Sequence, residues 1–178
     1  DGNSANPNIS YNESLVVTGI GPVPLADILA GMGKDNTALL EQIDKSFKPT
    51  SFATGKVMTM KANTTRHPEG RTCNVAGMIE GTDPALKDEV IIIGGHFDAV
   101  GNAGGLFVAG GFDNASGSVD ILAAAKALAT SGIKLKRTVL FLLIGGEEVG
   151  LLGSKHYTRN PLFPKEKTVT YINLDMVG

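Results

Sequence analysis

The chain has 178 residues with a net charge of -2, and 42% of them are hydrophobic, which fits one globular domain and part of another. The sequence has 16 basic and 18 acidic side chains, so there is no surplus of positive charge. We therefore expect neither a nucleic-acid nor an anionic-membrane partner. A single cysteine excludes an internal disulfide and a thiolate zinc cage, and no stretch has the roughly 18 apolar residues of a membrane span.

Residues 1–53 are predicted to be an N-terminal extension. Leu15–Thr18 is a short apolar run of strand type, and Leu25–Met32 and Thr37–Phe47 have the apolar spacing of helices. The segment Lys48–Ser51 combines a proline with polar residues and ends the helical region. We therefore expect a domain boundary near residue 53.

Residues 54–178 are predicted to form an α/β domain. Continuous runs of Val, Ile and Leu suit strands that are buried on both faces, and these runs alternate with helical segments. This order predicts right-handed βαβ units on a mixed, largely parallel sheet flanked by helices. The predicted strands are Lys56–Ala62, Thr72–Glu80, Val90–Gly94, Thr138–Ile144 and Thr168–Asp175, and the predicted helices are Ala115–Thr130 and Gly150–Arg159.

Three of the predicted strands run directly into acidic residues or histidine. In open α/β sheets, ligands bind outside the carboxyl ends of the strands, so these side chains are expected to meet at one edge of the sheet. One more acidic residue lies just before the long predicted helix. The edge is therefore expected to collect one imidazole and up to five carboxylates, namely His96 with Asp98, Asp113, Glu147, Glu148 and Asp175.

These carboxylates need a positive counter-charge. Like charges repel strongly in a low-dielectric cleft, and Lys155 is the only basic residue near the four motifs. A divalent metal is the simplest counter-charge, and imidazole with carboxylates suits zinc, with manganese and cobalt as alternatives. Because the carboxylates outnumber the usual ligands of one catalytic zinc, more than one ion is expected. Asp113 is placed to bridge two ions.

Spacing predicts roles for the remaining acidic residues. His96 and Asp98 are two residues apart, so in a strand they face one way, and Asp98 is placed to accept the second ring N–H of a ligating His96. Glu147 and Glu148 are adjacent and cannot point in one direction in an extended chain. One of them can bind a metal while the other stays free as a general base.

Each of these features has a structural explanation when it is taken alone. A single buried histidine is more often structural than ligating, acidic pairs are usually solvated, and a lone aspartate can cap a helix. Their repetition at three strand ends favours a metal site. His67 and His156 are predicted to be loop and helix-surface residues. The chain has no Gly-x-Ser-x-Gly elbow, His-Glu-x-x-His motif, P-loop or dinucleotide-binding glycine motif.

Glycine is concentrated around the predicted site. Eight of the 23 glycines lie between Gly94 and Gly117, and Gly145 and Gly146 directly precede the two glutamates. Glycine is expected where the backbone turns sharply or comes close to another segment, because it has no Cβ and adopts positive φ.

Four motifs together resemble the dinuclear zinc aminopeptidase family, which includes bacterial leucine aminopeptidases and glutamate carboxypeptidase. They occur in the order and approximate spacing of that family, and the resemblance covers Thr72 to Gly178. It implies the three-layer α/β sandwich of the family, incomplete at the C-terminus. The motifs are Gly95–Asp98, Asp113–Gly117, Glu147–Ser154 and Asn173–Met176.

The resemblance implies two zinc ions and a ligand set. His96 and Glu148 would hold one zinc, Asp175 would hold the other, and Asp113 would bridge both. The family's second zinc has a further histidine ligand well downstream, and the sequence ends at Gly178. We therefore expect partial metal occupancy and little activity for this chain.

The resemblance also implies the chemistry. Asp98 would orient the zinc-binding histidine, Glu147 would be the general base, and the Asp113–Asn114 peptide would be cis. The implied reaction is metal-assisted peptide hydrolysis, which in the aminopeptidase branch acts on peptides with a free N-terminus. Leu15–Phe52 resembles the end of a protease-associated domain, which implies a larger parent protein that is secreted or periplasmic.

Two other functions of the same fold are alternatives. One is a non-catalytic binding relative such as the transferrin receptor ectodomain, and the other is a cyclase with a single zinc. Every family position in the covered span carries the expected residue, which favours the enzyme over the first, and the whole bridging set disfavours the second. The sequence makes no prediction of the substrate side chain or of the oligomeric state.

Overall fold

The computed structural model describes residues 20–59, 69–103 and 106–178. Its contacts divide the chain into two compact units. The first unit includes Asn12–Pro68, and the second includes Glu69–Gly178. Each unit is described by itself. The domain boundary near residue 53 stays a prediction.

The first unit contains both of the helices predicted for it. Helix α1 (Pro22–Leu29) has a proline at its start, where the fixed φ of proline suits the helix. Helix α2 (Asn36–Ser46) is capped by Asp35, whose carboxylate accepts a hydrogen bond from the Ala38 amide at 2.9 Å. Neither helix has a buried residue.

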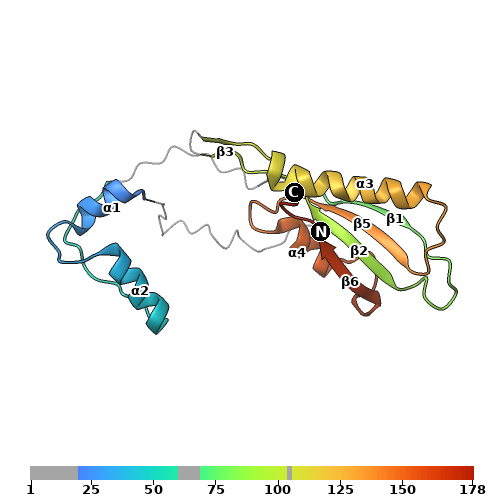
Figure 1. Cartoon of the computed structure of the whole chain (residues 1–178), viewed down its shortest axis with the longest axis horizontal. Helices are drawn as coiled ribbons and strands as arrows, with labels where there is room; N and C mark the ends of the chain where they lie inside the picture. The colour runs from blue at the N-terminus through green and yellow to red at the C-terminus, as the bar shows by residue number, and fades with distance from the viewer. Residues whose placement is uncertain (1–19, 60–68, 104–105) are drawn as a thin grey trace. The chain divides into compact units, whose positions relative to one another are not determined.

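The second unit is built on a sheet whose described strands are β1 (Val75–Ile79), β2 (Val90–His96), β5 (Thr138–Ile144) and β6 (Thr168–Asn173) (Figure 1). These strands lie in the order β1-β5-β2-β6. Strands β5, β2 and β6 are parallel, and β1 is antiparallel to β5. The predicted mixed, largely parallel sheet is confirmed.

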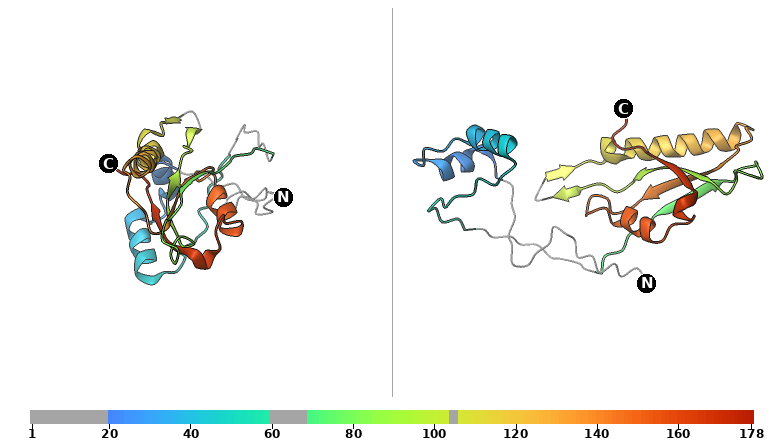
Figure 2. Two further views of the ribbon diagram at one scale, coloured as in Figure 1. Left: turned by 90° about the vertical axis from the view of Figure 1, so that its right-hand side faces the viewer. Right: turned by 90° about the horizontal axis from the view of Figure 1, so that it is seen from below.

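Helices cover both faces of this sheet, which gives three layers (Figures 1 and 2). On one face, Ile121 of α3 (Gly117–Thr130) packs with Val139 and Phe141 of β5. On the other face, α4 (Leu152–Arg159) contributes a tyrosine to a core that includes the β5 residue Leu140. Successive side chains of a strand point to opposite faces, so β5 supports both cores.

The connection from β2 to α3 contains structure that the sequence pattern does not predict. Strand β3 (Gly101–Ala103) pairs antiparallel with β4 (Leu106–Val108), and an irregular helical turn, η1 (Gly111–Ser116), leads into α3. Strands of three residues are too short to show a periodic pattern. A second short helical turn, η2 (Lys165–Lys167), precedes β6.

Two strands predicted near the front of the chain lie wholly or partly outside the described residues. The segment Leu15–Thr18 lies outside the described residues. Within Lys56–Ala62, residues 56–59 form no regular element, and the remaining three lie outside the described residues. In the described part of the chain, no helix has both the length and the apolar character needed to cross a membrane.

The doubly buried position of β5 makes its core side chains sensitive to truncation. Leu140 is 1% exposed, and we expect Leu140→Ala to lower the free energy of unfolding by about 2–5 kcal/mol, because it removes apolar contacts and leaves a cavity. The matched control is Leu122→Ala on α3, where the side chain is 57% exposed and the expected change is within about 0.5 kcal/mol. Urea unfolding followed by circular dichroism measures both. Equal effects at the two positions would contradict the assignment of the core.

Candidate metal centre

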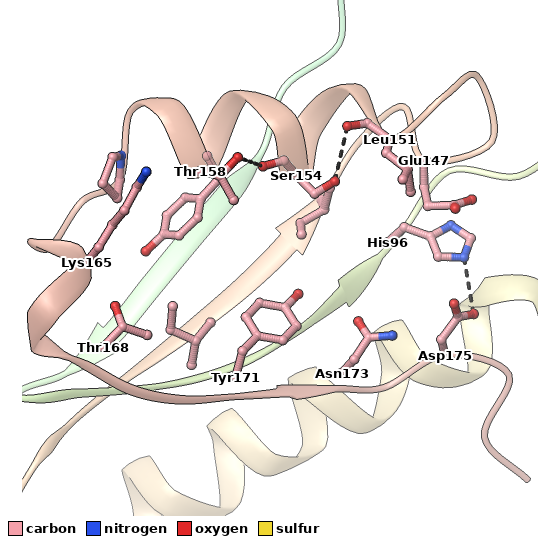
Figure 3. A pocket seen from close by; sticks show the side chains of 14 residues that line it. His96, Glu147, Leu151, Ser154, Thr158, Lys165, Thr168, Tyr171, Asn173 and Asp175 are labelled. Atoms are coloured by element: carbon pink, nitrogen blue, oxygen red, sulfur yellow. Dashed lines mark hydrogen bonds and ion pairs between the residues drawn. The ribbon is translucent and has the colours of Figure 1, made fainter. Parts of the chain in front are cut away.

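The register of the parallel strands brings the predicted site residues to one edge of the sheet. His96 at the end of β2 pairs with Ile144 at the end of β5, and Gly94 pairs with Asn173 at the end of β6. The residues that follow β5 and β6 therefore begin beside His96. Figure 3 shows the side chains of Glu147 and Asp175 on either side of the His96 ring.

His96 lies at the centre of the site and is 4% exposed. Its Nε2 atom is 3.1 Å from Oδ1 of Asp113 and 3.3 Å from Oδ1 of Asp175. We call these three residues the histidine–aspartate group. A ring nitrogen carries at most one proton, so Nε2 cannot donate a well-aligned hydrogen bond to both carboxylates. The arrangement suits a cation that all three side chains share.

Asp113 reaches this group from η1, where the backbone leaves helical geometry. Its φ and ψ are -109° and 97°, and the peptide bond to Asn114 is cis. The cis peptide implied by the family resemblance is thus present. The bend directs the carboxylate of Asp113 toward the ring of His96 while α3 begins four residues later at Gly117.

Asp98 holds the turn that carries the two glutamates. Its Oδ1 accepts a hydrogen bond from the Glu147 amide at 3.0 Å, and its Oδ2 accepts one from the Glu148 amide at 3.2 Å. The Nδ1 atom of His96 is 3.1 Å from the Asp98 carbonyl oxygen and 3.7 Å from the nearer carboxylate oxygen. Asp98 therefore contacts both the histidine and the backbone of the glutamates.

The turn after β5 requires glycine at two positions. A Cβ atom on Gly145 would lie 2.5 Å from the Cys73 carbonyl oxygen and would also collide with the Thr72 hydroxyl. Gly146 has a φ of +72°, which side chains other than glycine rarely adopt. This close packing fixes the backbone directly before Glu147.

Burial and neighbouring charges shift the pKa values of two site residues. Burial lowers the pKa of His96, but the negative charges of Asp175, Glu147 and Asp113 outweigh this effect and raise the pKa above 6.5. Burial raises the pKa of Glu147 above 4.5, the charge of His96 opposes that rise, and the charge of Glu148 adds to it. A partly buried carboxyl group with a raised pKa is suited to accept and release a proton.

The side chains present fit a metal ion. Besides the histidine–aspartate group, His96 forms a second group with Glu147 and Glu148, and in each group one ligand atom per residue lies within 4.8 Å of the others. Oε1 of Glu148 is buried and has no hydrogen-bond partner among the described residues. Such an atom is costly to bury, and a cation would satisfy it. Imidazole and carboxylate are ligands that zinc accepts.

A cavity of about 620 Å³ opens from the site and runs between α4 and β6 (Figure 3). His96, Glu147 and Asp175 line one end of it. Farther along, Tyr157 of α4 and Tyr171 of β6 face the cavity. Burial raises the pKa of Tyr171 to about 12, so its hydroxyl group stays neutral at physiological pH. The volume and mostly apolar lining are typical of a site for a small ligand.

The structure brings all six predicted site residues together, and their individual roles stay predictions. His156 is exposed on α4, as predicted, and His67 lies outside the described residues. The Lys155 ammonium donates a hydrogen bond to the Gly150 carbonyl oxygen at 2.7 Å. Asn114 is 1% exposed beneath the site, and the sequence gives no sign of its importance beyond its position next to an aspartate.

The fold and the site define an α/β domain that gathers one imidazole and five carboxylates, a set able to hold a metal ion, at the carboxyl edge of its sheet. Residues 74–178 match Peptidase family M28. The chain belongs to this peptidase family, and the predicted resemblance to the aminopeptidase family is confirmed.

Its relatives include aminopeptidases of fungi and bacteria. A probable leucine aminopeptidase 2 of Trichophyton verrucosum is 37% identical over 161 residues, which are 88% of this chain and 30% of the relative. Leupeptin-inactivating enzyme 1 of Streptomyces exfoliatus is 37% identical over 99 residues, which are 55% of this chain and 21% of the relative. The solved aminopeptidase of Aneurinibacillus sp. strain AM-1 is 32% identical with a TM-score of 0.49, over 59% of this chain and 24% of that chain. This chain therefore spans at most 30% of the length of these relatives.

The raised pKa values predict how the stability of the metal-free chain depends on pH. A group with a higher pKa in the folded state stabilises the fold below its unfolded pKa, and this contribution is lost as the pH rises through the folded value. For Glu147 the loss starts near 4.5, and for His96 it starts near 6.5. We expect the free energy of unfolding to fall across this range in chelator-treated protein, as measured by urea titration at several pH values.

Two variants test the source of this pH dependence. Glu147→Gln is expected to flatten the acid part of the fall, because it removes one titrating group and one charge beside His96. Glu166→Gln, at an exposed position in η2, serves as the control and is expected to leave the profile unchanged. A free energy of unfolding that rises with pH in the metal-free wild type would refute this explanation.

Proposed function

We propose that this chain supplies the metal-binding and proton-transferring residues of a zinc aminopeptidase. The observation that carries the proposal is the convergence of Asp113 and Asp175 on one nitrogen of His96, next to Glu147 with its raised pKa. Membership of Peptidase family M28 and the leucine aminopeptidases among the relatives support it.

The histidine–aspartate group would hold one zinc ion, because its three ligand atoms lie closest together around Nε2 of His96. Glu148, with its unpaired Oε1, would bind a second ion, and Asp113 would bridge the two. This assignment pairs His96 with Asp175, whereas the family resemblance pairs His96 with Glu148. When bound, zinc polarises a carbonyl group and lowers the pKa of a water molecule.

Glu147 would act as the general base. Its carboxylate takes a proton from the attacking water and delivers it to the leaving amine, and its raised pKa brings both steps nearer to physiological pH. Its backbone amide donates a hydrogen bond to the Asp98 carboxylate at 3.0 Å, which fixes the backbone that carries the base. Asp98 would therefore orient the base as well as the histidine.

The proposed substrates are peptides with a free N-terminus. The leucine aminopeptidases among the relatives support this choice, because an aminopeptidase cleaves next to a free N-terminus. We also propose that the parent protein is exported, because the sequence of Leu15–Phe52 resembles the end of a protease-associated domain; fractionation of the source cells tests this.

Glu147→Gln tests the function in the full-length protein. We expect hydrolysis of aminoacyl substrates to fall by a factor of about 10² or more, because the proton carrier is lost, while the zinc content stays the same. Acetyl-blocked substrates are expected to resist both proteins. Elemental analysis and a chromogenic peptidase assay provide the two readouts, and Glu166→Gln is the control.

The alternative functions predict other outcomes of this experiment. A non-catalytic binding relative would show no turnover in the wild type. Unchanged turnover after Glu147→Gln would remove that residue from the mechanism, and cleavage of acetyl-blocked substrates would argue against an aminopeptidase.

The ligand arrangement predicts the zinc stoichiometry of this chain. We expect one tightly bound ion per chain at the histidine–aspartate group and weaker binding at Glu148. Asp175→Asn removes a charged ligand and is expected to weaken the tight site by at least about tenfold. Competition with a chromophoric chelator measures both affinities. Two ions bound with equal affinity by the wild-type chain would contradict this arrangement.

A further inference from the structure

We propose that Asn114 is a positioning residue that sets the geometry of the histidine–aspartate group, and this inference rests on the proposed metal site. Asn114 is 1% exposed, and its side-chain amide makes four hydrogen bonds. Nδ2 donates to the carbonyl oxygens of His96 and Leu174, both at 3.0 Å. Oδ1 accepts from the amides of Gly117 and Met176, both at 3.1 Å.

These bonds use the whole hydrogen-bonding capacity of the side chain. An asparagine amide has two N–H donors and an oxygen with two lone pairs. Two carbonyl groups lie on the nitrogen side and two N–H groups on the oxygen side, so only one orientation of the amide is satisfied. Asn114 is therefore held in a single conformation, which a positioning residue requires.

The partners of Asn114 lie next to every member of the histidine–aspartate group. One partner is His96 itself, through its backbone carbonyl. Leu174 and Met176 are the two neighbours of Asp175, and Asn114 is bonded in sequence to Asp113. One buried amide thus connects the three backbone segments that carry the three ligands.

The packing around the Leu174 carbonyl shows how closely these segments approach. A Cβ atom on either Gly95 or Gly117 would collide with that carbonyl oxygen. Glycine at both positions lets the end of β6 lie against β2 and the start of α3, within reach of Asn114. Beyond the hydrogen bond from the Leu174 amide to the Gly94 carbonyl at 2.9 Å, the segment leaves the regular ladder of the sheet.

Asn114 matters to the site because the ligands themselves repel. The carboxylates of Asp113 and Asp175 lie 3.1 and 3.3 Å from Nε2 of His96, and two negative charges so close to one atom repel each other. Backbone groups that are hydrogen-bonded to the buried side-chain amide of Asn114 resist the separation of the two carboxylates, and these groups add no charge to the site. The amide therefore preorganises the ligands for an ion, which a residue that merely fills space would not do.

Asn114→Asp separates positioning from simple electrostatics. The substitution keeps the shape of the side chain, but it places a carboxyl oxygen against the carbonyl groups of His96 and Leu174. If charge alone mattered, an added carboxylate beside the site would tighten zinc binding. Positioning predicts the opposite, a loss of zinc affinity of about 10- to 100-fold, which is the usual effect of losing a residue that orients ligands.

Two readouts on the full chain distinguish this role from a purely structural one. Zinc affinity is measured by competition with a chromophoric chelator, and the absorption spectrum of the cobalt(II) form is recorded at saturating metal. We expect both to change in Asn114→Asp. The control is Thr138→Val, which removes a buried hydroxyl bonded to Lys87 and Gly81 at the other end of β5. It is expected to lower stability but to leave zinc affinity and the cobalt spectrum unchanged.

The remaining outcomes are decisive. Unchanged or tighter zinc binding in a folded Asn114→Asp variant overturns the inference. Asn114→Ser, which adds no charge, is the second variant if the first fails to fold, and the same loss of affinity is expected. If neither variant folds, Asn114 holds the fold as a whole and the inference is wrong. Failure of the wild-type chain to bind zinc would instead refute the proposed metal site.

Discussion

Repulsion between acidic side chains is the constraint on which this structure depends. Three aspartates and two glutamates surround one histidine at the edge of a sheet, and two like charges 4 Å apart repel by about 4 kcal/mol at an effective dielectric constant of 20. The backbone opposes this repulsion with neutral groups. The carboxylate of Asp98 is bound by two amides, and the amide of Asn114 joins the segments on the opposite side. One side of the site is therefore fixed by the partly buried carboxylate of Asp98 and the other by the buried amide of Asn114.

The sequence predicts the part of the site that follows from strand periodicity. Thr138–Ile144 was expected as a buried strand from its continuous apolar run, and β5 has the same bounds. Because parallel strands in one sheet end at one edge, the residues after β2, β5 and β6 were expected to meet, and His96, Glu147 and Asp175 do. Local pattern and general topology were sufficient to predict this part of the site, because each apolar run stops where polar residues begin.

The sequence does not predict contacts that depend on several distant segments. Asn114 bonds to Leu174 across 60 residues, and no periodicity marks such a contact. Asp98 was expected beside the ring of His96, and its Oδ1 lies 3.7 Å from Nδ1, but its hydrogen bonds to amides 49 and 50 residues away were not predicted. The hairpin of β3 and β4 was missed because strands of three residues carry no pattern. These features arise only when the turns close against one another.

Asp175 differs from His96 and the two glutamates because it follows a strand at the edge of the described sheet. Among the described strands, β6 lies at the edge of the sheet and pairs only with β2, and most of its residues are exposed. Edge segments with few buried contacts open more readily than central strands. An ion held between His96 and Asp175, as proposed, would cross-link the segment after β6 to the end of β2 in the middle of the sheet. Metal binding and the local stability of β6 would then be thermodynamically linked.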